Sequence, residues 1–217
     1  MQNWRYLVVE GNIGAGKTTL STMLSTHFSA RLVLEQFSDN PFLPGFYEDP
    51  GKYSFPLELS FLAERYQQLK DELSRADLFQ PLIVADYFVL KSLIFAQITL
   101  EQHEFELFSR LFKIIRDSLP LPDKIIYLHS NRERLKTNIQ FRGRPYEQNI
   151  QDEYLEKIQQ GYFSLLKSLE NLPVALVDAS GVDFVKNPSD FQRFVKLAEL
   201  PLAPGVHYFD SDRLNTL

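Results

Sequence analysis

The stretch YLVVEGNIGAGKTTL, residues 6–20, contains the most informative pattern in the chain. Residues 6–9 form a hydrophobic run typical of a buried strand, and residues 18–20 begin an amphipathic helical pattern. Between them, residues 11–18 match the complete phosphate-binding loop G-x-x-x-x-G-K-[ST]. The backbone amides of such a loop point at phosphate oxygens, so the stretch predicts that the chain binds a nucleoside triphosphate.

Two side chains of this loop carry chemical expectations. Lys17 is expected to reach the β- and γ-phosphates, and Thr18 to offer its hydroxyl to Mg²⁺. The N-terminus of the following helix adds a favourable dipole. The predicted ATP-binding residues are Gly11, Asn12, Ile13, Gly14, Ala15, Gly16, Lys17, Thr18 and Thr19. The alternative, a glycine-rich turn that matches by chance, conflicts with the strand–loop–helix setting of the whole motif.

Composition narrows the class of protein. The chain has 217 residues, a formal net charge of −5 and a pI near 5.4, which argues against a basic nucleic-acid groove. It has no cysteine, so disulfides and cysteine-based zinc sites are excluded, and no secretion signal is evident at its start. A long apolar stretch at residues 81–100 is interrupted by Asp86, Lys91 and Gln97, which argues against a membrane span. We therefore expect a cytoplasmic protein.

Strand and helix patterns alternate along the chain, which predicts an α/β fold of the P-loop NTPase type, with three layers and helices flanking a five-stranded parallel sheet. The predicted strands are 5–10, 31–35, 82–85, 124–129 and 174–178. The predicted helices are 16–28, 54–73, 88–116, 131–140, 150–170 and 188–199. One domain is expected over residues 1–200, and residues 201–217, which show no periodicity, are expected to form a C-terminal surface extension. Ligands of such sheets gather at the carboxyl ends of the strands.

Several segments that follow the loop resemble deoxynucleoside kinases, in the order seen in that family. They are Leu34-Glu35-Gln36-Phe37, Asn40-Pro41-Phe42-Leu43 with Phe46-Tyr47, Phe55-Pro56-Leu57-Glu58 running to Arg65, Arg142-Gly143-Arg144-Pro145-Tyr146-Glu147, and Asp183-Phe184-Val185. The resemblance spans nearly the whole chain and is strongest to the bacterial deoxyguanosine kinase branch. In that branch, as here, an Asp-Tyr pair (Asp86-Tyr87) ends the third strand and a lysine follows at the position of Lys91.

The sequence departs from better-known animal members at two positions. Those enzymes have an acidic-Arg-Ser triplet after the third strand, where this chain has Tyr87, and relatives often have an arginine where this chain has Asn138. Lys91, one helical turn past Asp86, is a candidate to supply some of the missing positive charge. A weakly active nucleotide-binding partner subunit is therefore an alternative of another class.

Candidate catalytic residues follow from strand ends and from the resemblance. Glu35 lies at the end of the second predicted strand, and the resemblance implies that it accepts the proton of the deoxyribose 5′-hydroxyl; the alternative is a solvated loop charge. Asp86 ends an apolar run and is placed to hold the Mg²⁺ hydration shell, with a helix N-cap as an alternative or additional role. Arg142 and Arg144 flank a glycine in a predicted lid over residues 138–149; the alternative is ordinary surface arginines.

The resemblance alone implies further contacts. Tyr47 and Glu147 would hold the sugar 3′-hydroxyl, with the Tyr47 ring disfavouring ribose. Asp183 and Phe184 would border the adenine of ATP. Phe95 is a candidate for stacking on the base, or for a place in the core.

Base selection can be argued from residue chemistry. Glu58, Leu62 and Arg65 recur at helical spacing on one face, so a carboxylate and a guanidinium would project into one pocket. An ionised glutamate only accepts hydrogen bonds and therefore matches the adjacent N1–H and N2–H₂ donors of guanine, while Arg65 would donate to O6 or N7. The alternative is a charged helix surface.

The sequence thus predicts an ATP- and Mg²⁺-dependent kinase that phosphorylates the 5′-hydroxyl of a purine deoxynucleoside in nucleotide salvage, most closely matching deoxyguanosine. A deoxyadenosine or broad-specificity deoxynucleoside kinase is the alternative within enzymes. The resemblance also implies a homodimer that pairs through helices, with small molecules as the substrates.

Overall fold

The computed structural model describes residues 4–36, 40–74, 81–148 and 150–216. The chain divides into two compact units. The first unit comprises Met1–Leu34, Asp77–Phe88 and Pro122–Leu217, and the second comprises Glu35–Ala76 and Val89–Leu121. The expectation of one domain over residues 1–200 stays a prediction.

The first unit contains a parallel sheet with the order β2-β3-β1-β4-β5-β6. Its strands are β1 (Tyr6–Gly11), β2 (Arg31–Val33), β3 (Ile83–Ala85), β4 (Lys124–His129), β5 (Pro173–Asp178) and β6 (Gly205–Phe209). β1 lies in the interior of the sheet, and all its residues are buried, as expected for a parallel strand covered on both faces. The predicted α/β fold with a parallel sheet is confirmed.

The prediction of five strands and a surface extension after residue 200 was wrong. β6 pairs with β5 from Gly205 opposite Pro173 to Phe209 opposite Val177, and Phe209 is buried. β6 is the edge strand after β5, with Val206 and Tyr208 exposed, so it lacks the continuous apolar run of an interior strand. A short helix, α9 (Ser211–Asn215), follows it.

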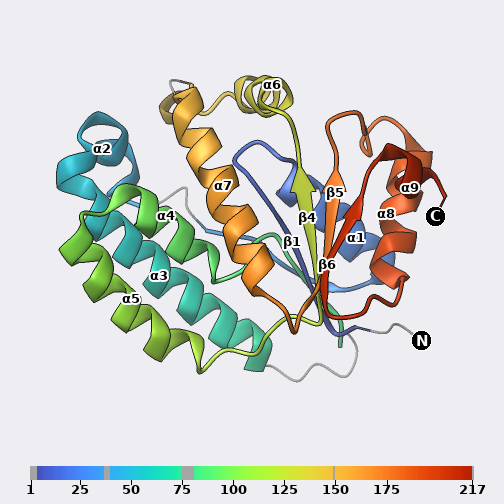
Figure 1. Ribbon diagram of the computed structural model, residues 1–217, viewed down its shortest axis with the longest axis horizontal. Coiled ribbons are helices and arrows are strands. Elements are labelled where there is room, and N and C mark those ends of the chain that lie inside the picture. Colours follow the sequence, from blue (N-terminus) through green and yellow to red (C-terminus); the bar gives the residue numbers. More distant parts are fainter. Residues whose placement is uncertain (1–3, 37–39, 75–80, 149, 217) are drawn as a thin grey trace. The chain divides into compact units, whose positions relative to one another are not determined.

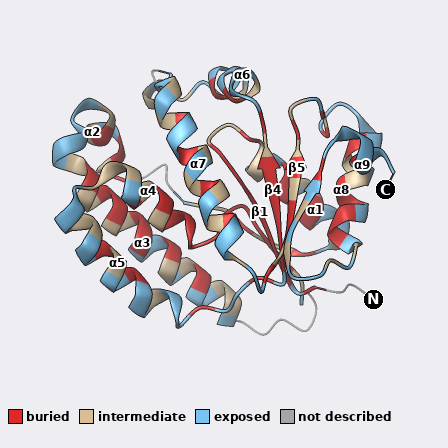
Figure 2. Ribbon diagram, in the orientation of Figure 1, coloured by how far each residue is buried: buried red, intermediate tan, exposed pale blue. Residues whose placement is uncertain are grey.

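Helices cover both faces of this sheet (Figure 1): α7 lies on one face, and α1 and α8 lie on the other. The helices of the first unit are α1 (Lys17–Phe28), α6 (Arg132–Arg142), α7 (Asp152–Ser168), α8 (Pro188–Glu199) and α9, with a 3-10 turn η1 (Pro145–Glu147). Buried apolar side chains of β1, β4, α1 and α8 form one core cluster, and β1 and β4 are buried along most of their length (Figure 2).

The second unit is helical in the part that the structure describes. It contains α2 (Leu43–Glu48), α3 (Pro50–Ser74), α4 (Lys91–Thr99) and α5 (Gln102–Arg116), with α3 packed against the other three. The predicted helix 54–73 begins earlier because Pro50 suits a first helical position and Asp49 accepts a hydrogen bond from the Lys52 amide. None of the helices described here is long and apolar enough to span a membrane.

The predicted helix 88–116 was wrong as one element. The chain after β3 enters α4 only at Lys91, and α4 ends at Leu100, which has an extended conformation. A new helix then starts at Glu101, whose amide donates to the Glu104 carboxylate at 3.1 Å. This local capping interaction restarts the helix in a new direction.

Candidate active site

The phosphate-binding loop connects β1 to α1 and depends on two glycines in the left-handed region. Gly14 has φ of 80°, and a Cβ there would lie 2.7 Å from Leu135 O and 2.9 Å from Ile139 Cγ1, so α6 packs directly on the loop. Gly16 has φ of 91° and precedes α1 with no side-chain cap. Because glycine has no side chain, Gly16 does not cap the amides of the first turn of α1. Uncapped amides at a helix N-terminus are suited to bind an anion.

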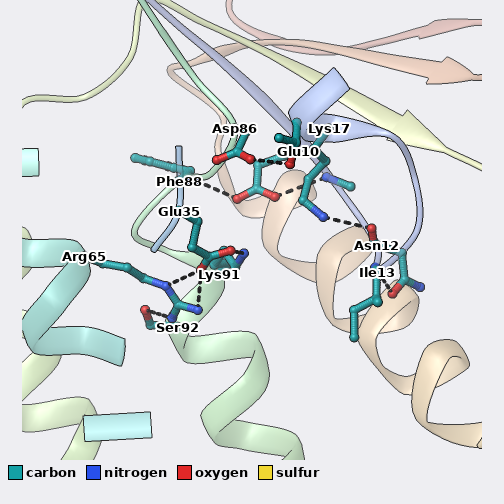
Figure 3. Close-up of polar contacts among 12 residues, drawn as sticks. Glu10, Asn12, Ile13, Lys17, Glu35, Arg65, Asp86, Phe88, Lys91 and Ser92 are labelled. Carbon is teal, nitrogen blue, oxygen red and sulfur yellow. Dashed lines mark hydrogen bonds and ion pairs between the residues drawn. The ribbon is translucent and has the colours of Figure 1, made fainter. Parts of the chain in front are cut away.

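The polar side chains of the loop make hydrogen bonds within the protein (Figure 3). The Lys17 ammonium donates to Asn12 O at 2.9 Å, and the Thr18 hydroxyl donates to Asp86 Oδ2 at 2.6 Å. Asn12 is buried; its amide nitrogen donates to Leu155 O of α7, and its Oδ1 accepts from the Ile13 amide. The structure thus brings together Lys17, Thr18 and Asp86, three residues that the sequence predicted for phosphate and metal binding.

Asp86 does not cap the following helix. It comes directly after β3, whereas α4 begins at Lys91 with Leu90 at the N-cap position. Its backbone amide donates to Val33 O, at the end of β2. The alternative role as a helix N-cap is therefore wrong, and the carboxylate is directed to Thr18 instead.

The donor set of Thr18 and Asp86 fits Mg²⁺. Both offer oxygen, and Mg²⁺ sites typically use one or two carboxylates while substrate phosphates and water complete the coordination. No group of three or more His, Cys, Asp or Glu side chains that could hold a metal occurs among the residues that the structure describes.

Glu10, the last residue before the loop, is not among the site residues predicted from the sequence. Its side chain is buried, and its carboxylate accepts hydrogen bonds from the Gly11 and Phe88 amides and from the Tyr162 hydroxyl. Burial, and secondarily the nearby Glu10 charge, raise the pKa of the Tyr127 phenol. A glutamate within a hydrophobic strand run was the available signal, because a charged residue in a buried strand needs dedicated partners.

The predicted lid region joins α6 to η1. Arg142 is the last residue of α6, Gly143 follows in the left-handed conformation with φ of 71°, and Arg144 precedes η1. Both arginines contact the buried Glu147 carboxylate: Arg142 at Oε2, and Arg144 at Oε1 with a distance of 3.1 Å. Asn149, within the predicted lid, lies outside the described residues. The structure thus brings the two arginines together with Glu147, which the resemblance assigned to the sugar.

Asn138 holds α6 against the loop. Its side-chain amide donates to Gly14 O at 2.7 Å. An amide therefore anchors the helix that leads to the two lid arginines, and it brings no positive charge.

Asp183 and Phe184 lie in the loop after β5. The Asp183 carboxylate accepts hydrogen bonds from the Val185 and Lys186 amides, and these bonds lower its pKa. Phe184 is buried and stacks edge-on against Phe194. The Phe184 ring also lies 3.1 Å from where a Cβ of Gly16 would be, so this loop contacts the phosphate-binding loop.

A carboxylate with two cationic partners occupies the second unit (Figure 3). Glu35 Oε1 accepts from Arg65, with Nε at 2.8 Å and Nη2 at 2.7 Å, and Glu35 Oε2 accepts from Lys91 at 2.6 Å. Arg65 also donates to the Ser92 hydroxyl at 2.7 Å. Glu35 follows β2 by two residues. The prediction that Glu35 ends this strand was therefore wrong. The alternative of a solvated loop charge is wrong, since both cations are largely buried.

Glu58 is buried on the same face of α3 as Leu62 and Arg65. The prediction of a shared helix face is confirmed, and the alternative of a charged helix surface is wrong. Glu58 Oε1 accepts a long hydrogen bond of 3.4 Å from the Thr99 hydroxyl, and Oε2 has no hydrogen-bond partner among the residues that the structure describes. Burial raises the pKa of Glu58 to about 7 despite the nearby positive charge of Arg65. A ligand that donates hydrogen bonds to this buried carboxylate would stabilise its ionised form.

Two further predicted residues lie in the second unit. Tyr47 is half-buried in α2, with its ring edge-on to Phe46. Phe95 is half-buried in α4, with the Lys91 ammonium 5.7 Å from its ring centre. Phe37, in the first motif that suggested the family, lies outside the described residues.

Comparison with known proteins agrees with this geometry. A family model described as deoxynucleoside kinase matches residues 7–200. The chain is 41% identical over 196 residues to a deoxyguanosine kinase of Bacillus subtilis, covering 87% of this chain and 93% of that protein. It is 28% identical over 197 residues to a deoxyadenosine kinase of Dictyostelium discoideum, covering 88% and 78%. A solved structure of deoxyadenosine kinase from M. mycoides, with dCMP and dCDP bound, has a TM-score of 0.78 at 24% identity and covers 90% of this chain and all of that one.

Proposed function

Because the chain belongs to the deoxynucleoside kinase family and is a phosphotransferase, we propose that it transfers the γ-phosphoryl group of ATP to the 5′-hydroxyl of deoxyguanosine, in nucleotide salvage. Membership of the family does not specify the phosphate donor or the base, so these two parts of the function are proposed. The single observation that supports the choice of base is the buried Glu58 carboxylate, whose Oε2 lacks a hydrogen-bond partner within the described part of the chain.

Guanine offers the hydrogen-bond donors that the Glu58 carboxylate needs. Its N1–H and N2–H₂ are adjacent donors, and a carboxylate offers two acceptor oxygens side by side. Paired with these donors, the ionised form of Glu58 would be stabilised, which offsets the cost of burying its charge. Adenine presents one donor and one acceptor on the corresponding edge and would leave one carboxylate oxygen without a donor. The identity to a deoxyguanosine kinase supports the same choice.

The phosphate side of the reaction uses the first unit. Lys17 would leave Asn12 O to bind the β- and γ-phosphates, and the amides of the loop would bind phosphate oxygens. Mg²⁺, when bound by Thr18 and Asp86, would neutralise phosphate charge. Arg142 and Arg144 would release Glu147 and bind the transferred phosphoryl group instead. Guanidinium groups suit this role because their planar set of donors matches the oxygens of a phosphoryl group.

The nucleoside, which accepts the phosphoryl group, would be activated by Glu35, the carboxylate that Arg65 and Lys91 contact in the second unit. Glu35 would accept the proton of the 5′-hydroxyl, and its ion pairs with Lys91 and Arg65 would fix the direction of its oxygens. Glu147, once released from the arginines, and Tyr47 would hold the 3′-hydroxyl. Lys91 brings a cation next to Glu35, although this chain lacks the arginine of animal relatives at Tyr87.

One assay tests the proposal. The purified chain alone is supplied with ATP, Mg²⁺ and each of the four deoxynucleosides and their ribose counterparts. We expect the highest kcat/KM with deoxyguanosine and little turnover of ribonucleosides. A higher kcat/KM with deoxyadenosine would instead favour a second candidate function, that of a deoxyadenosine kinase. The 28% identity to a deoxyadenosine kinase supports this candidate.

We also propose that the chain forms a homodimer through α5. Leu107, Leu111 and Ile114 are exposed at 42%, 39% and 74% and share one face of this helix, an arrangement typical of a helix that packs against a partner. Leu111→Glu should therefore shift the sedimentation coefficient of the wild-type dimer to that of a monomer. Lys113→Glu, on another side of α5, is the matched control and should remain dimeric.

A further inference from the structure

A buried carboxylate with no assigned role directly precedes the phosphate-binding loop. We propose that Glu10 is a positioning residue that sets the metal-binding pair Thr18 and Asp86 by bonding the loop to the segment after β3. The inference deepens the proposed function and depends on its use of MgATP.

The contacts of Glu10 connect three segments. Its Oε1 accepts from the Phe88 amide at 2.6 Å, and its Oε2 accepts from the Gly11 amide at 3.1 Å and the Tyr162 hydroxyl at 2.8 Å. Gly11 is the first residue of the loop, Phe88 lies two residues after Asp86, and Tyr162 belongs to α7. One side chain therefore holds the loop, the segment after β3 and a flanking helix together. Figure 3 shows its bond to Phe88.

These bonds complete a closed ring of interactions. The loop runs from Gly11 to Thr18, the Thr18 hydroxyl bonds Asp86, and the chain continues from Asp86 to Phe88, which returns to Glu10. The Asp86 amide is fixed separately by Val33 O at 3.1 Å. The backbone on both sides of Asp86 is therefore held, and the direction of its carboxylate relative to Thr18 follows from that constraint.

A glutamate suits this role better than its neutral analogue. The Gly11 amide, the Phe88 amide and the Tyr162 hydroxyl all donate to Glu10, and a carboxylate presents only acceptors. A glutamine would turn an NH₂ group toward at least one of them in a site that excludes water, leaving that donor unpaired. Residues that orient metal ligands through such bonds typically affect metal affinity or activity by about 10–100-fold.

The test measures nucleotide binding rather than turnover. Fluorescence titration with N-methylanthraniloyl-ATP, with Mg²⁺ and with EDTA, gives the metal-dependent gain in affinity for each variant. In Glu10→Gln we expect affinity in EDTA no weaker than wild type and a metal-dependent gain reduced about 10-fold. Tyr162→Phe keeps both amide contacts of Glu10, so we expect a much smaller reduction from it.

Two comparisons make the outcome decisive. Glu10→Asp retains a carboxylate but is one methylene shorter, so it should show the same selective loss even if Glu10→Gln folds poorly. A full metal-dependent gain in both Glu10 variants would overturn the positioning role alone. A wild-type chain that binds the probe equally well with and without Mg²⁺ would overturn the proposed use of MgATP and the positioning role together.

Discussion

Glu58→Gln replaces one oxygen of a buried carboxylate by nitrogen and leaves the shape of the side chain unchanged. Burial raises the pKa of Glu58 from 4.5 to about 7, against the lowering influence of Arg65, the Thr99 hydroxyl and Lys91. In the described ranges of the chain, no group donates a hydrogen bond to Oε2. The substitution therefore removes a charge that burial disfavours and tests whether that charge selects the base.

The stability change follows from the pKa. The difference between about 7 and 4.5 corresponds to about 3 kcal/mol, because one pKa unit is worth about 1.36 kcal/mol. The folded state holds the proton more tightly, so the stability linked to Glu58 is fully present below pH 4.5 and is lost as the pH rises through about 7. Glu58→Gln should therefore match wild type near pH 4 and exceed it by about 3 kcal/mol at pH 8. For a chain of this size that corresponds to a Tm increase of about 6–12 °C.

The effect on the substrate should have the opposite sign. If deoxyguanosine binds only the ionised carboxylate, a pKa of about 7 leaves about one molecule in eleven competent at pH 6, so KM should fall about 10-fold between pH 6 and pH 8. Glutamine cannot ionise, so the variant should lose this pH dependence. It should also lose about 1–3 kcal/mol in kcat/KM for deoxyguanosine and improve relatively with deoxyadenosine or deoxycytidine.

Thermal melting from pH 4 to pH 8 and kinetics with four deoxynucleosides at pH 6 and pH 8 measure both effects. Glu64→Gln is the matched control, because Glu64 lies on α3 but is exposed, and it should change neither quantity. Equal pH profiles of Tm in Glu58→Gln and wild type would refute the buried charge. Equal kcat/KM ratios across the four deoxynucleosides would refute its role in selecting guanine.

Three other substitutions test the remaining parts of the site. Lys17→Ala should abolish phosphoryl transfer without changing Tm by more than a few degrees, since Lys17 acts on phosphate rather than on core packing; wild-type turnover would contradict the loop assignment. Glu35→Gln should lower kcat by about 10²–10⁴-fold with a modest change in nucleoside KM, and an unchanged kcat in steady-state assays would move the proton acceptor elsewhere. Gly14→Ala should lower Tm more than Gly143→Ala, because both have positive φ but only at Gly14 would a Cβ overlap other atoms, so equal losses would contradict the contact with α6.

Much of the phosphate side was predictable from the chain alone because its signals are local. The loop motif needs only the strand before it, the helix after it and glycines at left-handed positions, and the structure has all three. Asp86 could be placed because it directly follows an apolar strand of a parallel sheet. Glu58, Leu62 and Arg65 could be placed on one face because helical periodicity depends on spacing alone.

Contacts between distant segments were not predictable in this way. β6 depends on pairing with β5, and its exposed residues gave no strong strand pattern. The break between α4 and α5 depends on a capping bond within an otherwise continuous helical pattern. Glu10 bonds Phe88 and Tyr162, which are 78 and 152 residues away along the chain.

The same limit applies to the charge of the site residues. Spacing showed that Glu58 faces the same way as Arg65, but not that burial raises its pKa to about 7. Spacing likewise did not show that Arg65 and Lys91 both bind Glu35, or that Glu147 binds Arg142 and Arg144. Local sequence sets backbone conformation and side-chain periodicity, whereas the cost of burying a charge depends on every group packed around it, which only the folded chain brings together.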